Sequence, residues 1–234
     1  MYFVTVGLAD EIEVIQKVKP PRILCSYWFF KNKPLSSFCE RIGYKPEIML
    51  DSGAYSAYTR GKNVNLLDYM NYIRDNREYI THYISLDVIG DDDLTLAFYR
   101  IMRDKGLNPV PVFHHSSDYS LMDGYRKMGA KYVALGGTVP LSNKAAVAQW
   151  CNHLSALYPD LSFHLLGSCS QKFLVCPSIV SCDATTWYMR AVKGCPETIP
   201  GKTRESKRAR AEANMIDIME RFNDFPIFSN HSAV

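Results

Sequence analysis

Three aspartates stand at or just after the ends of three short apolar runs. A carboxylate at the end of a buried strand contributes little to packing, whereas the strand ends of barrels and doubly wound sheets open into the ligand crevice. An aspartate placed there can act as a nucleophile or as a general acid or base. We therefore interpret the chain as an enzyme built around Asp51, Asp87 and Asp183. The runs that carry them are Met49-Leu50-Asp51, Ile84-Ser85-Leu86-Asp87 and Ile179-Val180-Ser181-Cys182-Asp183.

The first aspartate opens the segment Asp51-Ser52-Gly53-Ala54-Tyr55. Small side chains such as those of Ser52 and Gly53 let a ligand approach the backbone, and the ring of Tyr55 can stack on a flat base. The same residues also describe a tight turn followed by a core tyrosine. This segment alone leaves both interpretations open.

The other two aspartates suit different tasks. Asp87 can accept two parallel hydrogen bonds, which matches the adjacent N–H donors on the pairing edge of guanine, although it could equally cap a helix or form an ion pair. Asp183 lies among apolar and small residues, where a carboxylate can form a covalent glycosyl ester at an anomeric carbon. The alternative for Asp183 is a buried acid that hydrogen-bonds Thr185 or Thr186.

Two further segments end apolar runs, Leu135-Gly136-Gly137-Thr138 and Phe163-His164-Leu165-Leu166-Gly167. The paired glycines expose backbone groups that could bind a carbonyl oxygen, or they make a tight turn. The apolar surroundings of His164 favour a core or supporting position over a catalytic one.

Hydrophobic periodicity alternates between short β-rich runs and helical stretches, which predicts repeated βα units. Asp92-Asp93 and Ser142 precede their helices as N-caps, and Gly106 and Gly129 follow theirs as C-caps. The predicted strands are 3–6, 22–27, 48–51, 82–87, 110–114, 132–135, 163–166 and 179–182, and the predicted helices are 66–79, 92–105, 119–128 and 143–157.

Eight strands separated by helices fit either a (β/α)8 barrel or an open doubly wound sheet. The aspartates favour the barrel, because it brings the ends of strands that are distant in sequence around one mouth. No Gly-x-Gly-x-x-Gly or phosphate-binding loop motif supports a nucleotide-binding open sheet. We predict an α/β fold of the (β/α)8, TIM-like type over residues 1–200, followed over residues 201–234 by a basic helix and tail packed on the barrel.

Composition and charge limit the partners. A hydrophobic share of 47%, with neither a membrane-length apolar run nor a secretory leader, predicts a cytoplasmic globular protein without membrane contact. Seven irregularly spaced cysteines predict reduced thiols, and we assign no metal and no cofactor. The net charge is only +3, but five cations gather at the start of a helix expected to end near Phe222. They could hold nucleic-acid phosphates or form a solvated helix face. They are Lys202, Arg204, Lys207, Arg208 and Arg210.

Taken in order, five segments resemble motifs of the tRNA-guanine transglycosylase superfamily, which exchanges guanine for a 7-deazaguanine within a nucleic acid on a (β/α)8 barrel. The cysteine cluster that binds structural zinc in the tRNA-acting members is absent from residues 193–234. The chain therefore looks more like the short, zinc-free DNA 7-deazaguanine transglycosylases of phages and bacterial modification clusters; a phage-encoded member would act in the host cytoplasm. The matching segments are Asp51-Ser-Gly-Ala-Tyr55, Asp87, Gly136-Gly137, His164-Leu-Leu-Gly167 and Asp183.

The resemblance implies a double displacement on DNA, with tRNA as the second choice of polymer. Asp183 would attack C1′ of a flipped-out guanine nucleotide, and Asp51 would take a proton from the incoming free 7-deazaguanine base, such as preQ0. Asp87 would read the base and Tyr55 would stack on it. The other positions carried over to the base site are Ser52, Gly53, His114 in place of a glutamine, Gly136, Gly137, Thr138 and Leu166.

Two other classes of function fit the same residues. One is a nucleoside or glycoside hydrolase with two carboxylates, in which Asp51 activates water. The other is a non-catalytic barrel that binds nucleic acid. Incorporation of labelled guanine into a polymer separates exchange from both. The sequence indicates neither an oligomeric state nor the sequence context of the target.

Overall fold

The computed structural model describes residues 1–139, 141, 143–170 and 176–223. Eight strands alternate with helices, and every pair of neighbouring strands is parallel. The strands are β1 Tyr2–Thr5, β2 Arg22–Ser26, β3 Glu47–Asp51, β4 Ile80–Tyr83, β5 Val112–His114, β6 Tyr132–Gly136, β7 Ser162–Leu165 and β8 Ile179–Ala184.

The sheet closes on itself. Its strand order is β4-β3-β2-β1-β8-β7-β6-β5, and the two outer strands meet through a parallel bridge between Ile84 and Val110. At this bridge Ser85 N–H donates to the Val110 carbonyl and Val110 N–H donates to the Tyr83 carbonyl, both at 2.8 Å. The predicted (β/α)8 class is therefore confirmed, and the carboxyl ends of all eight strands surround one mouth.

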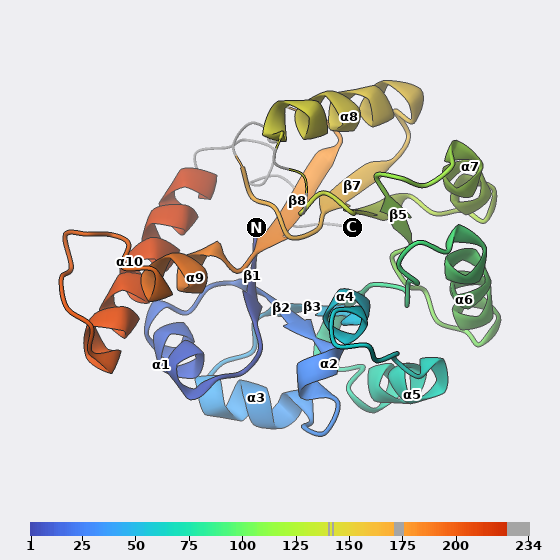
Figure 1. Cartoon of the computed structure of the whole chain (residues 1–234). Helices are drawn as coiled ribbons and strands as arrows, with labels where there is room; N and C mark the ends of the chain where they lie inside the picture. The colour runs from blue at the N-terminus through green and yellow to red at the C-terminus, as the bar shows by residue number, and fades with distance from the viewer. Residues whose placement is uncertain (140, 142, 171–175, 224–234) are drawn as a thin grey trace.

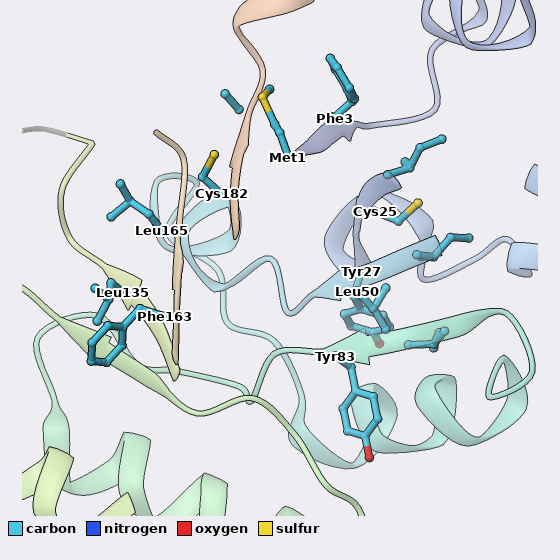
Figure 2. Close-up of a cluster of buried hydrophobic side chains, with 14 of the residues drawn as sticks. Met1, Phe3, Cys25, Tyr27, Leu50, Tyr83, Leu135, Phe163, Leu165 and Cys182 are labelled. Atoms are coloured by element: carbon cyan, nitrogen blue, oxygen red, sulfur yellow. The ribbon is translucent and has the colours of Figure 1, made fainter. Parts of the chain in front are cut away.

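Alternation along each strand separates two apolar layers. The outward layer packs under the helices. Figure 2 labels ten residues of this layer, among them Phe3, Leu50, Leu135 and Phe163. The inward layer forms a second, smaller cluster. Residues of the mouth continue these inward rows, because a strand repeats its facing every two residues. The inward cluster comprises Tyr2, Leu24, Met49, Ile84, Val110, Val112 and Ala134.

Helices surround the strands as a ring (Figure 1). Their inner faces carry residues at helical spacing that pack on the strands, as in α6, where Thr95, Tyr99 and Met102 are buried. The helices are α1 Ala9–Val18, α2 Tyr27–Phe30, α3 Leu35–Ile42, α4 Ala54–Tyr58, α5 Leu66–Asp75, α6 Asp92–Asp104, α7 Tyr119–Lys127, α8 Lys144–Leu157, α9 Thr186–Val192 and α10 Arg204–Asn223.

Several predicted boundaries were wrong. The second strand ends at Ser26, and Tyr27 begins the short helix α2. The fourth strand ends at Tyr83, so Asp87 lies on the loop after it, whereas β8 extends two residues further than predicted and contains Asp183. Helices α1, α2, α3, α4 and α9 were not predicted; α2 and α4, at four and five residues, are too short to show a helical period.

The helix caps also differ from the prediction in part. Asp91, the first of three consecutive acids, caps α6 by accepting from Leu94 N–H at 2.9 Å, and Asp92 begins the helix. The expected cap Ser142 lies outside the described residues, and Asn143 caps α8 by accepting from Ala145 and Ala146 N–H groups. Gly106 and Gly129 follow α6 and α7 in the left-handed conformation, with φ of 78° and 83°, as expected of residues that end helices.

The C-terminal helix α10 packs against α9 and α1. All seven cysteines of the chain are unpaired, and five of them are buried. Among the described residues no helix is long and apolar enough to cross a membrane.

Candidate active site

The three aspartates share one electrostatic environment at the mouth. Asp51 ends β3, directly opposite Ser26 of β2, and continues the inward row of Met49. Burial, followed by the negative charges of Asp87 and Asp183, raises the pKa of Asp51 to about 7. Since both other carboxylates act on Asp51, the fold brings together side chains from β3, β8 and the loop after β4. A carboxyl group with a pKa near 7 can both give and take a proton at neutral pH.

Asp183 is held through one of its two oxygens. Oδ1 accepts from the Gly167 N–H at 3.0 Å and lies 2.9 Å from His164 Nε2. Oδ2 accepts no hydrogen bond from the described residues, although the side chain is only 7% exposed. The carboxylate is therefore fixed in orientation while one oxygen remains available to attack.

A chain of hydrogen bonds orients His164 from behind. Its Nδ1 bonds the Ser181 hydroxyl, which also bonds the Tyr132 hydroxyl. An ionised carboxylate can only accept, so His164 Nε2 donates to Asp183. The Nδ1 of a neutral imidazole then accepts from the Ser181 hydroxyl, and the oxygen of that hydroxyl accepts from the Tyr132 hydroxyl. Burial raises the pKa of Tyr132 far above its ordinary value, which keeps this phenol a donor. The chain fixes the tautomer that presents an N–H to Asp183.

From the sequence we predicted a core or supporting position for His164, and in the structure this residue supports Asp183 through a hydrogen bond. The imidazole is fully buried and lies edge-on between the rings of Tyr2 and Tyr132. Tyr132 and Ser181 were not singled out from the sequence. One signal was present, because Ser181 and Asp183 are two residues apart on one strand and so face the same side.

A second carboxylate–histidine pair lies on the loop after β4 and at the end of β5. His114 ends β5, and its Nε2 lies 3.0 Å from Asp87 Oδ2. The Ser52 hydroxyl donates to Asp87 Oδ1 at 3.2 Å. A carboxylate has about four acceptor positions, so each oxygen of Asp87 can still accept one further bond. The expected base-reading residues Ser52, Asp87 and His114 thus form one hydrogen-bonded group.

Two glycines permit close packing around these side chains. A side chain at Gly136 would meet His114 Cδ2 at 2.8 Å and Leu166 Cδ1 at 3.6 Å, so the ring of His114 needs the empty space. Gly53 has a φ of 75°, and a side chain there would lie 2.5 Å from Trp28 Cβ. Its N–H donates to Asp51 Oδ2 at 2.9 Å. Both glycines are required by contacts of the site.

Other expected ligand-binding groups lie around the same mouth. The Gly137 N–H follows β6 and donates to no acceptor among the described residues. The buried hydroxyls of Thr138, after β6, and Ser85, after β4, have no hydrogen-bond partner among these residues either. An unpaired buried polar group is costly, so the position of the Thr138 hydroxyl just beyond the end of β6 indicates that a ligand completes it. Tyr55 lies on α4 and is 54% exposed, which leaves its ring free to stack.

The basic run at the start of α10 serves mainly to attach that helix. Arg204 pairs with Asp10 and Arg208 with Glu13, both partners being on α1. Arg210 is buried and donates to the carbonyls of Ala191, Ile199 and Gly201.

These contacts correct the sequence interpretation of the run. Arg210 is a packing residue and is not available to a phosphate. Lys202 and Lys207 form no ion pair with the described residues, so they remain candidate phosphate ligands.

Comparisons with known proteins support the fold. No known family model and no curated protein matches the chain. A putative fructose-1,6-biphosphate aldolase from Coccidioides immitis superposes with a TM-score of 0.56 at 10% identity, over 96% of this chain and 89% of that one. The YdjI aldolase from Escherichia coli K12 superposes with a TM-score of 0.52 at 14% identity, over 97% of this chain and 91% of that one. At such identities the likeness shows a shared barrel and does not carry the chemistry across.

Proposed function

We propose that the protein is a base-exchange transglycosylase that replaces guanine in DNA with a 7-deazaguanine base through a covalent Asp183 intermediate. The observation that carries the proposal is the arrangement of Asp183: one oxygen is fixed by His164 and Gly167, and the other accepts no hydrogen bond from the part of the chain that the structure describes. The order and spacing of the mouth residues, which resemble the transglycosylase motifs, support the same conclusion.

In the first displacement, Asp183 Oδ2 attacks C1′ of the target nucleotide while the bond from C1′ to the base nitrogen breaks. The electron pair leaves with guanine, which takes the proton held by Asp51. A pKa of about 7 leaves Asp51 protonated in a large fraction of molecules at neutral pH. The product is a glycosyl ester of Asp183.

In the second displacement, the incoming deazaguanine gives its N–H proton to Asp51 and its nitrogen attacks C1′. Asp183 leaves as a carboxylate, and Asp51 ends the cycle protonated as it began. Asp87, supported by Ser52 and His114, accepts from the N–H groups on the base's pairing edge. The Gly137 N–H, which donates to no described residue, is available for the base's carbonyl oxygen.

Imine chemistry has less support than carboxylate chemistry at this mouth. Formation of an imine with a carbonyl substrate needs a lysine amine. None of the eight strands carries a lysine, whereas Asp51 and Asp183 lie on strands and Asp87 follows one. We therefore do not extend the names of the aldolases to this chain.

Incorporation of radiolabelled guanine into polymer tests the proposal. Wild-type protein is incubated separately with duplex DNA and with bulk tRNA, and Asp183→Asn serves as the inactive control. We expect label in DNA and none with the variant. Label in tRNA alone would retain base exchange and move the substrate to RNA. A folded protein that labels neither polymer contradicts the proposal.

A hydrolase is the second candidate, and it rests on the pKa of Asp51. A carboxyl group with a pKa near 7 can also activate water against the same glycosyl ester. Release of guanine from DNA without incorporation of label would favour hydrolysis over exchange.

A further inference from the structure

A cavity beside Asp183 is not explained by base binding. It has a volume of about 570 Å³ and lies between the loop after β7, the start of α9 and the C-terminal half of α10. Its polar lining includes Ser168, Ser170 and Thr186, and its apolar lining includes Ile218. The volume lies within the range of small-molecule sites.

The charge of this cavity is one-sided. Lys144, Arg190 and Arg221 line it, and among the described residues that line it there is no carboxylate. Arg221 pairs with Asp217 one turn earlier on α10. Lys144 and Arg190 form no ion pair within the described part of the chain. Two uncompensated cations and several hydroxyl donors facing one cavity favour an anionic ligand.

The cavity adjoins the proposed nucleophile through Gly167. Gly167 lines it, and the N–H of the same residue donates to Asp183 Oδ1 at 3.0 Å. Gly167 has a φ of 68°, and a side chain there would lie 2.4 Å from Cγ2 of Val139, another lining residue. A single residue of backbone therefore separates an anion in the cavity from the carboxylate that attacks C1′.

We propose that this cavity binds the phosphodiester group next to the target nucleotide, with Arg190 and Lys144 as its charged ligands. This inference rests on the proposed function, because a glycosyl ester at Asp183 places the adjoining phosphate one sugar away. Loops after the seventh and eighth strands of barrels often bind phosphate, and this cavity is lined by the loop after β7 and by α9, the helix that follows β8. The apolar wall formed by Ile218 and Val139 accommodates the uncharged part of the neighbouring nucleotide.

Calorimetric titration with three probes tests the inference: guanine, deoxyguanosine, and deoxyguanosine 3′,5′-bisphosphate. The variants are Arg190→Gln and Lys144→Gln. The matched control is Lys127→Gln, which removes the same charge from the exposed end of α7. We expect the wild-type protein to bind the bisphosphate at least tenfold more tightly than deoxyguanosine. Each cavity variant should lose about tenfold in affinity for the bisphosphate and nothing for guanine. The control should bind all three probes as wild type does.

The probes separate failure of the inference from failure of the proposed function. Tight guanine binding with equal bisphosphate affinities in wild type and both cavity variants would overturn the phosphate site and leave the proposed function standing. Absence of guanine and deoxyguanosine binding would contradict the proposed function, and with it the assignment of the cavity to a phosphodiester. A parallel loss of affinity for guanine in the cavity variants would show a general disturbance of the mouth and also overturn the inference.

Discussion

The two carboxylate–histidine pairs of the mouth have nearly equal lengths and unlike surroundings. Asp183 and His164 lie on the adjacent strands β8 and β7, and their side chains are 7% and 0% exposed. Asp87 lies on a loop and His114 on β5, and their side chains are 11% and 10% exposed. Tyr132 and Ser181 support the first pair through a chain of hydrogen bonds, whereas the second pair is slightly more exposed and hydrogen-bonds Ser52 of another loop.

Under the proposed function, the two pairs have different tasks. A reacting atom must be held in one place, and a strand pair with a buried partner does this at little entropic cost. A base-reading group must exchange its own hydrogen bonds for those of a ligand, which is easier on a loop at the surface of the mouth. Substitutions in the Asp183 pair should therefore change kcat, and substitutions in the Asp87 pair should change KM.

The largest effect is expected from Asp183→Asn. An amide is a poor nucleophile, so exchange should fall by about 10⁴-fold or more and no covalent enzyme–DNA adduct should form. The fold should survive, because an amide oxygen can still accept from His164 and Gly167. Guanine exchange and denaturing-gel trapping of the adduct measure the effect. Turnover within tenfold of wild type would remove Asp183 from the mechanism.

His164→Ala should produce the next largest effect. It removes a fully buried ring and leaves Asp183 Oδ1 with one partner, so we expect a loss of about 2–4 kcal/mol in unfolding free energy. We also expect kcat to fall about 100-fold with KM nearly unchanged, because His164 positions the nucleophile without contacting the base. Urea unfolding and steady-state kinetics measure the two effects.

His164→Gln provides the control for position, since its amide N–H can donate to Asp183. Partial recovery of kcat is expected with this variant. If both variants raise KM and leave kcat unaltered, the contrast between the two pairs is wrong.

The charges of Asp87 and Asp183 both raise the pKa of Asp51, so the ionisation of Asp51 should change the free energy of unfolding. Its folded pKa of about 7 lies above the ordinary value of 3.8, so the folded state binds the proton more tightly than the unfolded state. Between about pH 4 and pH 7 this group makes the protein less stable as pH rises, and above pH 7 the penalty is constant.

Asp51→Asn removes that penalty and can still accept from Gly53. The variant should gain on the order of 1–4 kcal/mol over wild type at pH 8, with a smaller gain at pH 5, while losing exchange activity. Chemical denaturation at the two pH values measures the gain. An equal difference at both pH values would show that Asp51 is not the group whose pKa is raised.

The positions of the proposed catalytic carboxylates were predictable from the sequence, and the hydrogen bonds that hold them were not. Local alternation and apolar runs are enough to predict eight strands and to place Asp51 and Asp183 at their ends. The bond between His164 and Asp183 depends on the register of β7 against β8, which shifts at Phe163 and leaves no local signal.

The packing of α10 on the barrel also could not be predicted from the sequence. The cations at the start of α10 form a conspicuous cluster, yet Arg204 and Arg208 pair with α1. Arg221, at the other end of the helix, lines the cavity near Asp183. Only the packing of α10 on the barrel determines which end faces the mouth.

The smallest effect is expected from Gly136→Ala, because it disturbs the Asp87–His114 pair and leaves the Asp183–His164 pair unchanged. The new methyl group would lie 2.8 Å from His114 Cδ2, so the ring must move and its bond to Asp87 must lengthen. We expect KM for guanine to rise about tenfold while kcat changes by less than threefold. The matched control is Gly124→Ala in α7, where the nearest atom is 4.0 Å away and alanine favours the helix. A fall in kcat without a rise in KM would mean that the Asp87 pair positions the reacting atoms too, and the division between the two pairs would not hold.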